Sequence, residues 1–247
     1  MVATMKGITK YELRSMEIYY LPVKDSNLGI IHSYITQLRI NDPSMGVLLD
    51  ETFMPVAERT VVSEKITSWL INNLFADIAK FRAREVSAEW FSVYIPIRVI
   101  SKEGFLQEMQ ETATLKNITL NDICIAFSNK ILYEDQNAIS SIFTQIKEMG
   151  MKTMILDFGD EFCPITRLSS IKTDFVYLSK SVTESLKSSK EEKRDAVLSL
   201  YQFLNSLNVK AITSSIQDDE MVSLLPEDSV LYTGKYSGNY RKPRSVR

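Results

Sequence analysis

The chain has 247 residues, of which 45% are hydrophobic and 24% are charged, and its formal net charge at pH 7 is −2. This composition is typical of a globular protein rather than a disordered or fibrous one, and the length suits a single α/β barrel. The near-neutral charge and the absence of an apolar run of about 20 residues exclude a general attraction to nucleic acid and a membrane-spanning helix.

The first elements in chain order are two strands with no helix between them. Residues 17–23 and 29–40 have the strand-like composition, and alternation of apolar and polar residues is partial in the second. Ser63 then opens a helix, because apolar residues recur after it at the three- and four-residue spacing of one buried face. These residues are Ile66, Trp69, Leu70, Leu74, Ile78 and Phe81.

From residue 90 onward, strands alternate with helices. We predict strands at residues 90–97, 123–128, 153–158, 174–178, 209–214 and 230–233. Helices are predicted at residues 102–113, around residues 139–146 with Gly150 as the terminating residue, and after a capping box formed by Ser188 and Glu191. About eight strands in ~250 residues predict an α/β fold of the closed (β/α)8 TIM-like barrel type, here with a strand–strand opening.

The predicted organisation is one barrel with two short flanking segments. Residues 1–15 form an N-terminal lead, residues 16–234 form the barrel, and residues 235–247 form a basic C-terminal tail. The tail has five basic residues and no acid, so it could contact phosphate or an acidic partner. We expect a frayed terminus instead, because terminal residues are usually poorly ordered unless they are docked.

The cysteine and histidine content limits the kinds of metal and catalytic site that we expect and indicates the cellular compartment. Cys124 and Cys163 are the only cysteines and do not make a disulfide framework, and the N-terminus lacks the apolar run of a signal peptide, so we expect a reduced, cytoplasmic setting. His32 is the only histidine. Zinc sites and hydrolase triads that need a second histidine are therefore disfavoured.

Three segments in a fixed order carry a resemblance to a known family. They are Phe53-Met54-Pro55-Val56-Ala57-Glu58, then Met149-Gly150 with Ile155-Leu156-Asp157-Phe158-Gly159, and finally Gly234-Lys235-Tyr236-Ser237-Gly238 followed by Pro243. Over residues 16–243 the chain resembles the EAL-domain family of cyclic-di-GMP phosphodiesterases. The resemblance implies an EAL-type variant of the barrel and an active site with two divalent cations, which need oxygen ligands that are mostly carboxylates.

The strand ends at which the family places its ligands and base carry other residues here. The matching positions are Ile35, Tyr94, Phe127, Leu156, Tyr177, Ser214, Gln217 and Thr233. Asp157 is the one retained acid, and we expect it to be a satisfied structural carboxylate. Glu58, Asp160 and Glu161 are further acids near expected loops, and their use as new metal ligands would be speculative. We therefore predict no catalytic residue, no metal, no cofactor and no enzymatic activity.

Arg39 is the candidate ligand-binding residue, as a vestige of the family's site. The resemblance places the matching arginine beside the bound dinucleotide, and a guanidinium can hold a phosphate through two parallel hydrogen bonds. The alternative, which we favour, is an arginine paired with an acid at the barrel mouth such as Asp157. Binding of cyclic-di-GMP is accordingly expected to be weak or absent.

The leading functional hypothesis is a degenerate, catalytically inactive EAL-like regulator that binds a protein through barrel helices or mouth loops. Its size and opening segment, residues 17–23, resemble the small YdiV-type EAL proteins of enteric bacteria, which bind the master transcription activator of flagellar genes. The predicted partner is such an activator, with no direct contact to nucleic acid or membrane. The alternative is a receptor that binds cyclic-di-GMP without hydrolysing it. No residue constellation indicates an enzyme with rebuilt chemistry.

Overall fold

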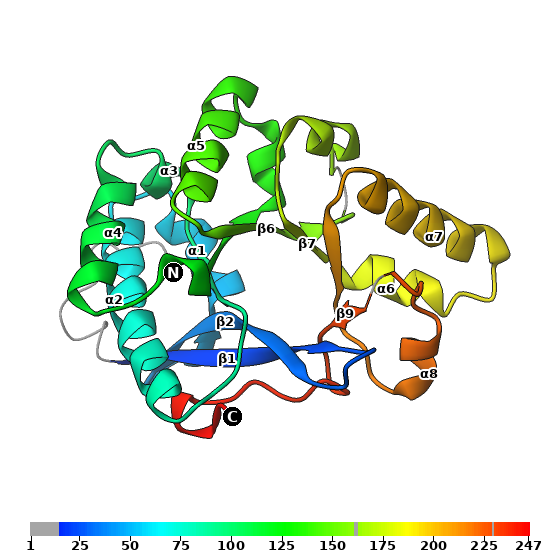
Figure 1. The fold of residues 1–247 in the computed structure, drawn as a ribbon, viewed down its shortest axis with the longest axis horizontal. Coiled ribbons are helices and arrows are strands. Elements are labelled where there is room, and N and C mark those ends of the chain that lie inside the picture. Colours follow the sequence, from blue (N-terminus) through cyan, green and yellow to red (C-terminus); the bar gives the residue numbers. More distant parts are fainter. Residues whose placement is uncertain (1–14, 161–162, 229) are drawn as a thin grey trace.

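The computed structural model describes residues 15–160, 163–228 and 230–247, and it shows a barrel of strands surrounded by helices (Figure 1). The strands are β1 (Met16–Asp25), β2 (Ile31–Asp42), β3 (Gly46–Leu49), β4 (Phe91–Tyr94), β5 (Ile123–Ser128), β6 (Lys152–Phe158), β7 (Phe175–Leu178), β8 (Lys210–Thr213) and β9 (Leu231–Tyr232). Their order is β1-β9-β8-β7-β6-β5-β4-β2-β3, and a further β1–β2 pairing closes the barrel. The predicted TIM-like barrel is confirmed.

Strand β1 is the one strand of the closed barrel that runs against its neighbours. It pairs antiparallel with both β2 and β9, whereas the other barrel strands pair in parallel. The direct turn from β1 to β2 explains this arrangement, because two strands joined without a crossover helix must lie antiparallel. The predicted strand–strand opening is therefore the feature that distinguishes this barrel from the ideal pattern.

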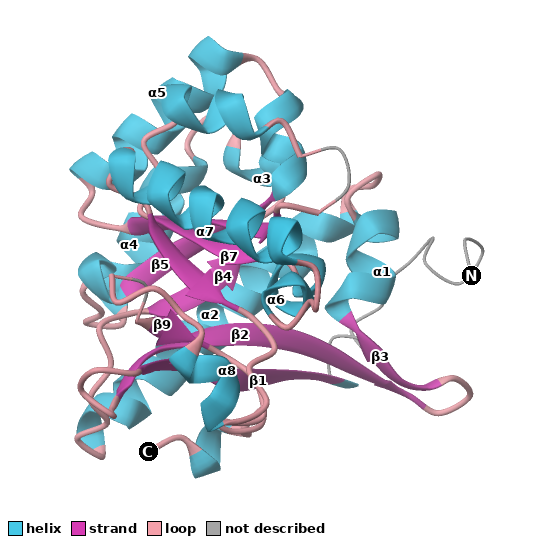
Figure 2. Ribbon diagram, turned by 90° about the vertical axis from the view of Figure 1, so that its right-hand side faces the viewer, coloured by secondary structure: helices cyan, strands magenta, loops and turns pink. Residues whose placement is uncertain are grey.

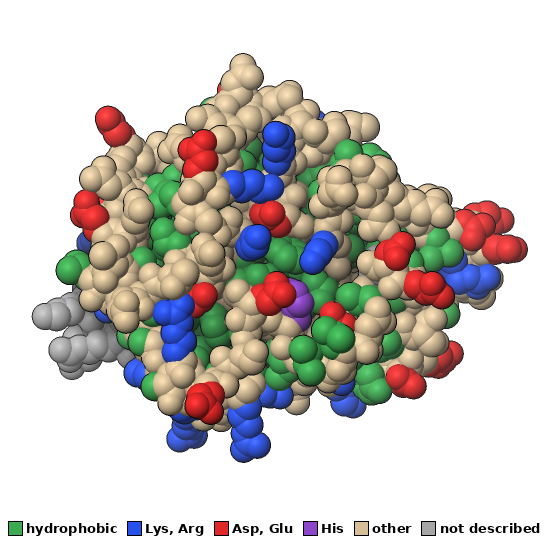
Figure 3. All heavy atoms as spheres, viewed as in Figure 1, with side chains coloured by type: hydrophobic (Ala, Val, Ile, Leu, Met, Phe, Trp, Pro, Cys, Tyr) green, Lys and Arg blue, Asp and Glu red, His purple; other side chains and the backbone are tan. Residues whose placement is uncertain are grey.

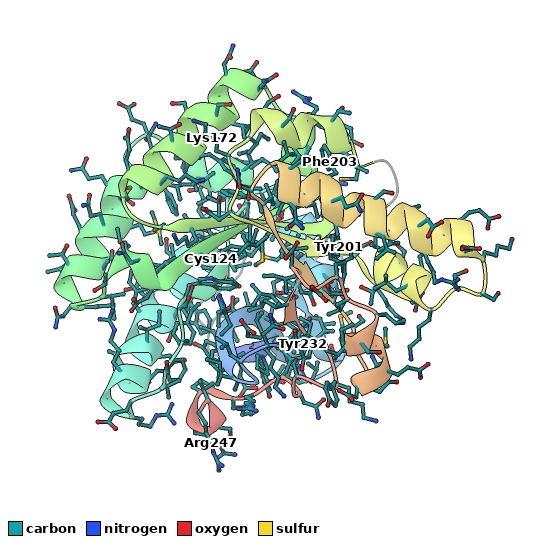
Figure 4. All side chains as sticks on the ribbon, turned by 45° about the vertical axis from the view of Figure 1, so that its right-hand side comes forward. Cys124, Lys172, Tyr201, Phe203, Tyr232 and Arg247 are labelled. Atoms are coloured by element: carbon teal, nitrogen blue, oxygen red, sulfur yellow. The ribbon has the colours of Figure 1, made fainter. Side chains whose placement is uncertain are left out.

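Successive residues of each strand face opposite sides of the barrel wall. Ile35 belongs to the interior core, with Cys124 and Met154, whereas Tyr34 belongs to the larger core between the strands and the surrounding helices. Figure 4 labels one residue of each kind: Cys124 lies in the barrel interior, and Tyr201 lies between a helix and the wall, where its hydroxyl is 2.7 Å from Thr213 Oγ1.

Helices cover the outside of the wall (Figures 1 and 2). The α-helices are α1 (Asp50–Ala57), α2 (Val62–Ala83), α3 (Ile97–Ile100), α4 (Phe105–Leu115), α5 (Gln136–Glu148), α6 (Lys180–Leu186), α7 (Glu191–Ser206) and α8 (Asp219–Ser223). Short 3₁₀ helices lie at Leu120–Asp122, Asn129–Tyr133, Ile165–Ser170 and Pro243–Ser245. The apolar face predicted after Ser63 is buried in α2, except that Trp69 is only partly buried. No helix of the described ranges is long and apolar enough to cross a membrane.

Two local predictions have different outcomes. Gly150 follows the end of α5 with φ of +85°, a left-handed conformation that glycine adopts without strain, so its terminating role is confirmed. The capping box is wrong, because α7 begins at Glu191 with Lys190 before it and no side-chain cap. The Ser188 hydroxyl instead accepts a hydrogen bond from the backbone N–H of Lys190 at 3.2 Å.

The C-terminal tail is docked, which contradicts the expectation of a frayed terminus. The backbone N–H groups of Tyr20 and Arg241 each donate to the other residue's carbonyl, at 2.9 and 2.8 Å. The Tyr34 hydroxyl donates to the Arg247 carbonyl at 2.5 Å, and Val246 is only 1% exposed. Because β9 pairs with β1 only at Lys24 and Asp25, the rest of that β1 edge is open to the tail. The predicted lead lies outside the described residues except for Ser15.

Candidate functional site

A pocket of about 380 Å³ opens at the carboxyl ends of the parallel strands. Its wall comes from the ends of β2, β4, β5, β6 and β7, from α1 and from Tyr240 of the tail. Ligand sites of α/β barrels lie at this end, because the loops that follow the strands meet there. We therefore take this pocket, called the mouth below, as the candidate functional site.

The lining of the mouth is predominantly acidic. Its carboxylates are those of Asp50, Glu51, Glu58, Asp157 and Asp160, and Lys130 is the one cation among the described residues that line it. An excess of acids in a concave site focuses a negative potential. The mouth should therefore repel anions unless a cation enters with them.

Asp50 is the most enclosed of these acids. It begins α1, and its two carboxylate oxygens accept hydrogen bonds from the backbone N–H groups of Leu38 at 3.1 Å and Glu51 at 3.0 Å. Burial raises the pKa of Asp50 to about 6, because the charged form loses hydration, although the two backbone donors oppose the shift. Asp50 thus titrates in a range in which an ordinary aspartate is fully ionised.

Asp157 lies near the end of β6 with φ of +51°, a left-handed conformation that aspartate tolerates better than most residues. Within the described part of the chain its carboxylate accepts no hydrogen bond and forms no ion pair, but the residue is exposed and water can hydrate it, so its structural role stays a prediction. Loss of hydration raises the pKa of Asp157, and the negative charges of Glu51 and Asp160 add to the increase. The retained acid therefore lies close to other negative charges.

The residues of the mouth do not fit the two-metal centre that the resemblance implies. Ile35 and Leu156 present apolar side chains to the pocket, and the Tyr94 hydroxyl donates to the Glu58 carboxylate. Across residues 15–160, 163–228 and 230–247, no three side chains of histidine, cysteine, aspartate or glutamate gather closely enough to hold a metal ion. The absence of a metal ligand set at this site remains a prediction for experiment.

Phe127 is one of four matched positions that are not among the described residues lining the mouth, together with Ser214, Gln217 and Thr233. Phe127 stacks on Phe143 of α5 with ring centroids 5.1 Å apart, so its side chain lies outside the wall. Its neighbours Ala126 and Ser128 line the pocket instead. A shift of one residue along a strand moves a side chain to the other face, and sequence matching alone could not fix that register. The expectation that Phe127 lines the mouth is corrected accordingly.

Arg39 lies beside the mouth in an aromatic environment. The centre of its guanidinium lies 3.8 Å from the ring centroid of Tyr19 and 5.2 Å from that of Tyr240. Its Nε donates a hydrogen bond to Gln37 Oε1 at 2.9 Å. The guanidinium thus has an amide and two rings as partners, and it forms no ion pair with Asp157 or with another acid of the described residues.

The opposite end of the barrel carries the single histidine of the chain. His32 lies there within 3.3 Å of Glu89, and burial lowers its pKa despite that neighbour. Figure 3 shows acidic and basic side chains interspersed on this face, with the single histidine in purple. The acids described above are concentrated in the cavity at the mouth.

The chain is similar to known proteins along almost its full length. The sequence model of the EAL domain matches residues 8–232. A cyclic di-GMP phosphodiesterase of Pseudomonas aeruginosa is 23% identical over 210 residues, which are 84% of this chain and 35% of that protein. A probable cyclic di-GMP phosphodiesterase of Escherichia coli K12, PdeB, is 20% identical over 221 residues, covering 90% of this chain and 42% of that protein. The chain thus spans less than half the length of these two relatives.

The barrel also matches solved structures. The MucR phosphodiesterase in complex with cyclic di-GMP superposes with a TM-score of 0.85 at 15% identity, covering 96% of both chains. At this level of identity the likeness shows a shared fold.

These comparisons contradict the prediction that the chain is not an enzyme. The two relatives described above are named as a phosphodiesterase and a probable phosphodiesterase, and the solved structures that share its fold include EAL enzymes. The prediction rested on a few side chains at the strand ends, whereas the match extends over the whole barrel. It also placed Phe127 in the mouth, where the structure has Ala126 and Ser128.

Proposed function

Because the chain belongs to the EAL domain family, we propose that it acts as a regulator whose working surface binds another protein. The observation that carries this proposal is an apolar hairpin that projects past the mouth. The hairpin, residues 40–49, joins the end of β2 to β3. Figure 2 shows it extending away from the body of the barrel.

The tip of the hairpin exposes apolar side chains. Met45 is 52% exposed and Val47 is 57% exposed, and the turn between the strands is held by Asp42, whose carboxylate accepts hydrogen bonds from the N–H groups of Ser44 and Met45, both at 2.8 Å. Single exposed apolar residues are ordinary on protein surfaces, but two together on a projecting, hydrogen-bonded turn offer apolar area for a partner to bury. This supports a contact with protein rather than with solvent alone.

The hairpin also offers backbone groups. β3 is the last strand in the sheet order, so its outer edge pairs with no other strand of the described residues. An exposed edge can accept a strand from a partner, in which main-chain hydrogen bonds supply affinity and side-chain pockets supply specificity. The mode of binding that we propose is therefore strand addition at β3, with Met45 and Val47 as apolar contacts.

The partner that we propose is the master transcription activator of flagellar genes. The support is the resemblance of the opening segment, residues 17–23, to small YdiV-type EAL proteins that bind such an activator. A transcription activator acts in the cytoplasm, so the same location is proposed for this chain. Capture of the activator would lower expression of flagellar genes.

A second candidate function is binding of cyclic-di-GMP in the mouth. It is favoured by the pocket of about 380 Å³ at the strand ends and by the cyclic di-GMP bound in the MucR phosphodiesterase structure. The acidic lining weighs against it, because like charges at short range repel in a cavity that is partly shielded from water. The two candidates use different residues and can be separated.

The decisive experiment is a titration of the purified chain with the purified flagellar activator. The test variant carries Met45→Asp and Val47→Asp, which place charge on the proposed contact. We expect the dissociation constant to rise at least about tenfold, as expected when a contact worth about 1.4 kcal/mol is lost. The control is Leu115→Asp, which adds one negative charge, half that of the test variant, at an 87% exposed apolar residue that ends α4, and it should change affinity by less than about twofold.

Three outcomes would count against the proposal. Equal binding by the hairpin variant and the unsubstituted chain would remove the hairpin from the interface. No binding of the activator at about 10 µM would remove the proposed partner. The third outcome is hydrolysis of cyclic-di-GMP by the same preparation, with no sign that the chain and the activator affect each other. The function would then be the phosphodiesterase activity of the family.

A further inference from the structure

Tyr240 separates Arg39 from the mouth. Its ring lines the pocket and also lies over the Arg39 guanidinium, with 5.2 Å between them. Gln37, which accepts the hydrogen bond from Arg39, lines the pocket as well. Arg39 itself is not one of the described residues that line it. The one arginine that could receive a phosphate is thus covered by a residue of the chain's own tail.

Tyr240 is held in place by its neighbours in the tail. On one side, the Ser237 hydroxyl donates to the carbonyl of Pro22 at 2.9 Å. On the other side, Arg241 exchanges two backbone hydrogen bonds with Tyr20, and Lys242 pairs with Glu17 at 2.9 Å. The hydroxyl of Tyr240 has no hydrogen-bond partner in the described part of the chain. Its ring, positioned by the backbone, is therefore the part that acts on Arg39.

The consequence is electrostatic. With Arg39 covered, an anion entering the mouth meets an excess of carboxylates and a single lysine, Lys130. An arginine freed from its aromatic contacts can instead grip a phosphate with two parallel hydrogen bonds. The rings of Tyr19 and Tyr240 compete with a phosphate for the same guanidinium, because both attract its positive charge.

We propose that Tyr240 is a built-in gate that keeps the mouth closed to phosphodiester ligands by caging Arg39. Displacement of the ring, by substitution or by a partner that pulls on the tail, frees Arg39 and creates a binding site for a cyclic dinucleotide. The inference concerns the tail and the mouth, so it stands or falls independently of the hairpin.

The test is calorimetric titration with cyclic-di-GMP in a buffer that contains a chelator, so that metal-dependent turnover cannot interfere. Tyr240→Ala should lower the dissociation constant at least about tenfold, the lower end of what a charged hydrogen bond contributes. Tyr240→Phe keeps the ring and should bind like the unsubstituted chain. Tyr236→Ala removes another tyrosine of the same tail, one that stacks on Tyr232 away from the mouth, and should also leave binding unchanged.

Two results would overturn the gate. The first is an unchanged affinity of Tyr240→Ala, whether or not the tail stays docked, because the Tyr240 ring no longer covers Arg39 in either case. The second is an improved affinity that persists in the double variant Tyr240→Ala with Arg39→Ala, because the freed group would then not be Arg39. If Tyr240→Ala does not fold, Tyr240→Val, which retains apolar volume without the ring, carries the same expectation.

Discussion

The floor and the mouth of the barrel interior are built from the same strands but treat polar groups in opposite ways. The floor packs apolar side chains that are almost completely buried: Trp90, Cys124, Met154, Phe175 and Ile212. The mouth, further along the barrel, is lined by five carboxylates, and the pKa values of two of them, Asp50 and Asp157, are raised. Floors of this kind stabilise a fold, whereas titratable groups kept in unfavourable environments mark the part of a barrel that serves function.

Trp90 is a suitable residue for testing how much the packing of the floor contributes to the stability of the fold. Its ring lies 5.0 Å from that of Phe175 and 6.0 Å from that of His32, between centroids. Within the described residues its indole N–H has no hydrogen-bond partner. A buried donor without a partner costs free energy, so the packing of the ring must outweigh that cost.

The largest effect is expected for Trp90→Ala. Removal of a fully buried aromatic side chain should lower the free energy of unfolding by about 3–5 kcal/mol, through lost burial and the cavity left behind. Urea unfolding at neutral pH measures this change. Trp90→Phe is the matched control, since it keeps a ring and removes the unpaired N–H, and it should cost less than about 1.5 kcal/mol. Equal losses in both variants would show that the indole N–H has a partner.

A smaller and pH-dependent effect is expected at the mouth. The pKa of Asp50 is about 6 in the folded protein, above the 3.8 of an aspartate in an unfolded chain, so folding favours its protonated form. The stability that this proton supplies is complete below pH 4 and is lost as the pH rises through 6. Asp50→Asn should remove this dependence. Relative to the unsubstituted chain, the variant should gain up to about 3 kcal/mol between pH 4 and pH 7.

The measurement is the difference in unfolding free energy between the two proteins at each pH, which cancels the contributions of all other groups. A constant difference across the range would mean that Asp50 keeps an ordinary pKa. Ionisation of Asp50 would then lower the free energy of unfolding by less than the contrast with the floor implies.

The sequence was more informative about the floor than about the mouth, for a physical reason. Alternation within strands and spacing within helices predict which residues are buried, and most strands and the long helix α2 were located in this way. Asp50 and Glu51 reach the mouth because the β2–β3 hairpin turns the chain back and begins α1 at Asp50. That hairpin was not predicted, since its four-residue strand is too short to show a period.

The tail and Arg39 illustrate the same limit. Pairing of Arg241 with Tyr20 depends on an open edge of β1, which is a property of the closed sheet and not of either segment alone. Once the tail is docked, Tyr240 reaches Arg39, and the expected partner Asp157 is replaced by aromatic rings. The basic composition of the tail indicates a contact with phosphate or an acidic partner surface. Its position is instead set by backbone hydrogen bonds to β1.

The smallest effect is expected from divalent cations, and it tests whether the acids of the mouth are gathered for a metal. A ligand present at a hundredfold excess over its dissociation constant stabilises the folded state by about 2.7 kcal/mol. In a domain of this size such a gain raises the melting temperature by roughly 5–10 °C. Because no three potential ligands of the described residues converge, millimolar Mn²⁺ should shift melting by less than about 1 °C. A shift above about 5 °C that disappears in Asp157→Asn would place a metal at the end of β6 and make the unpaired carboxylates its ligands. Persistence of the shift in that variant would locate the ion elsewhere, and the mouth would keep its role as an acidic cavity closed by Tyr240.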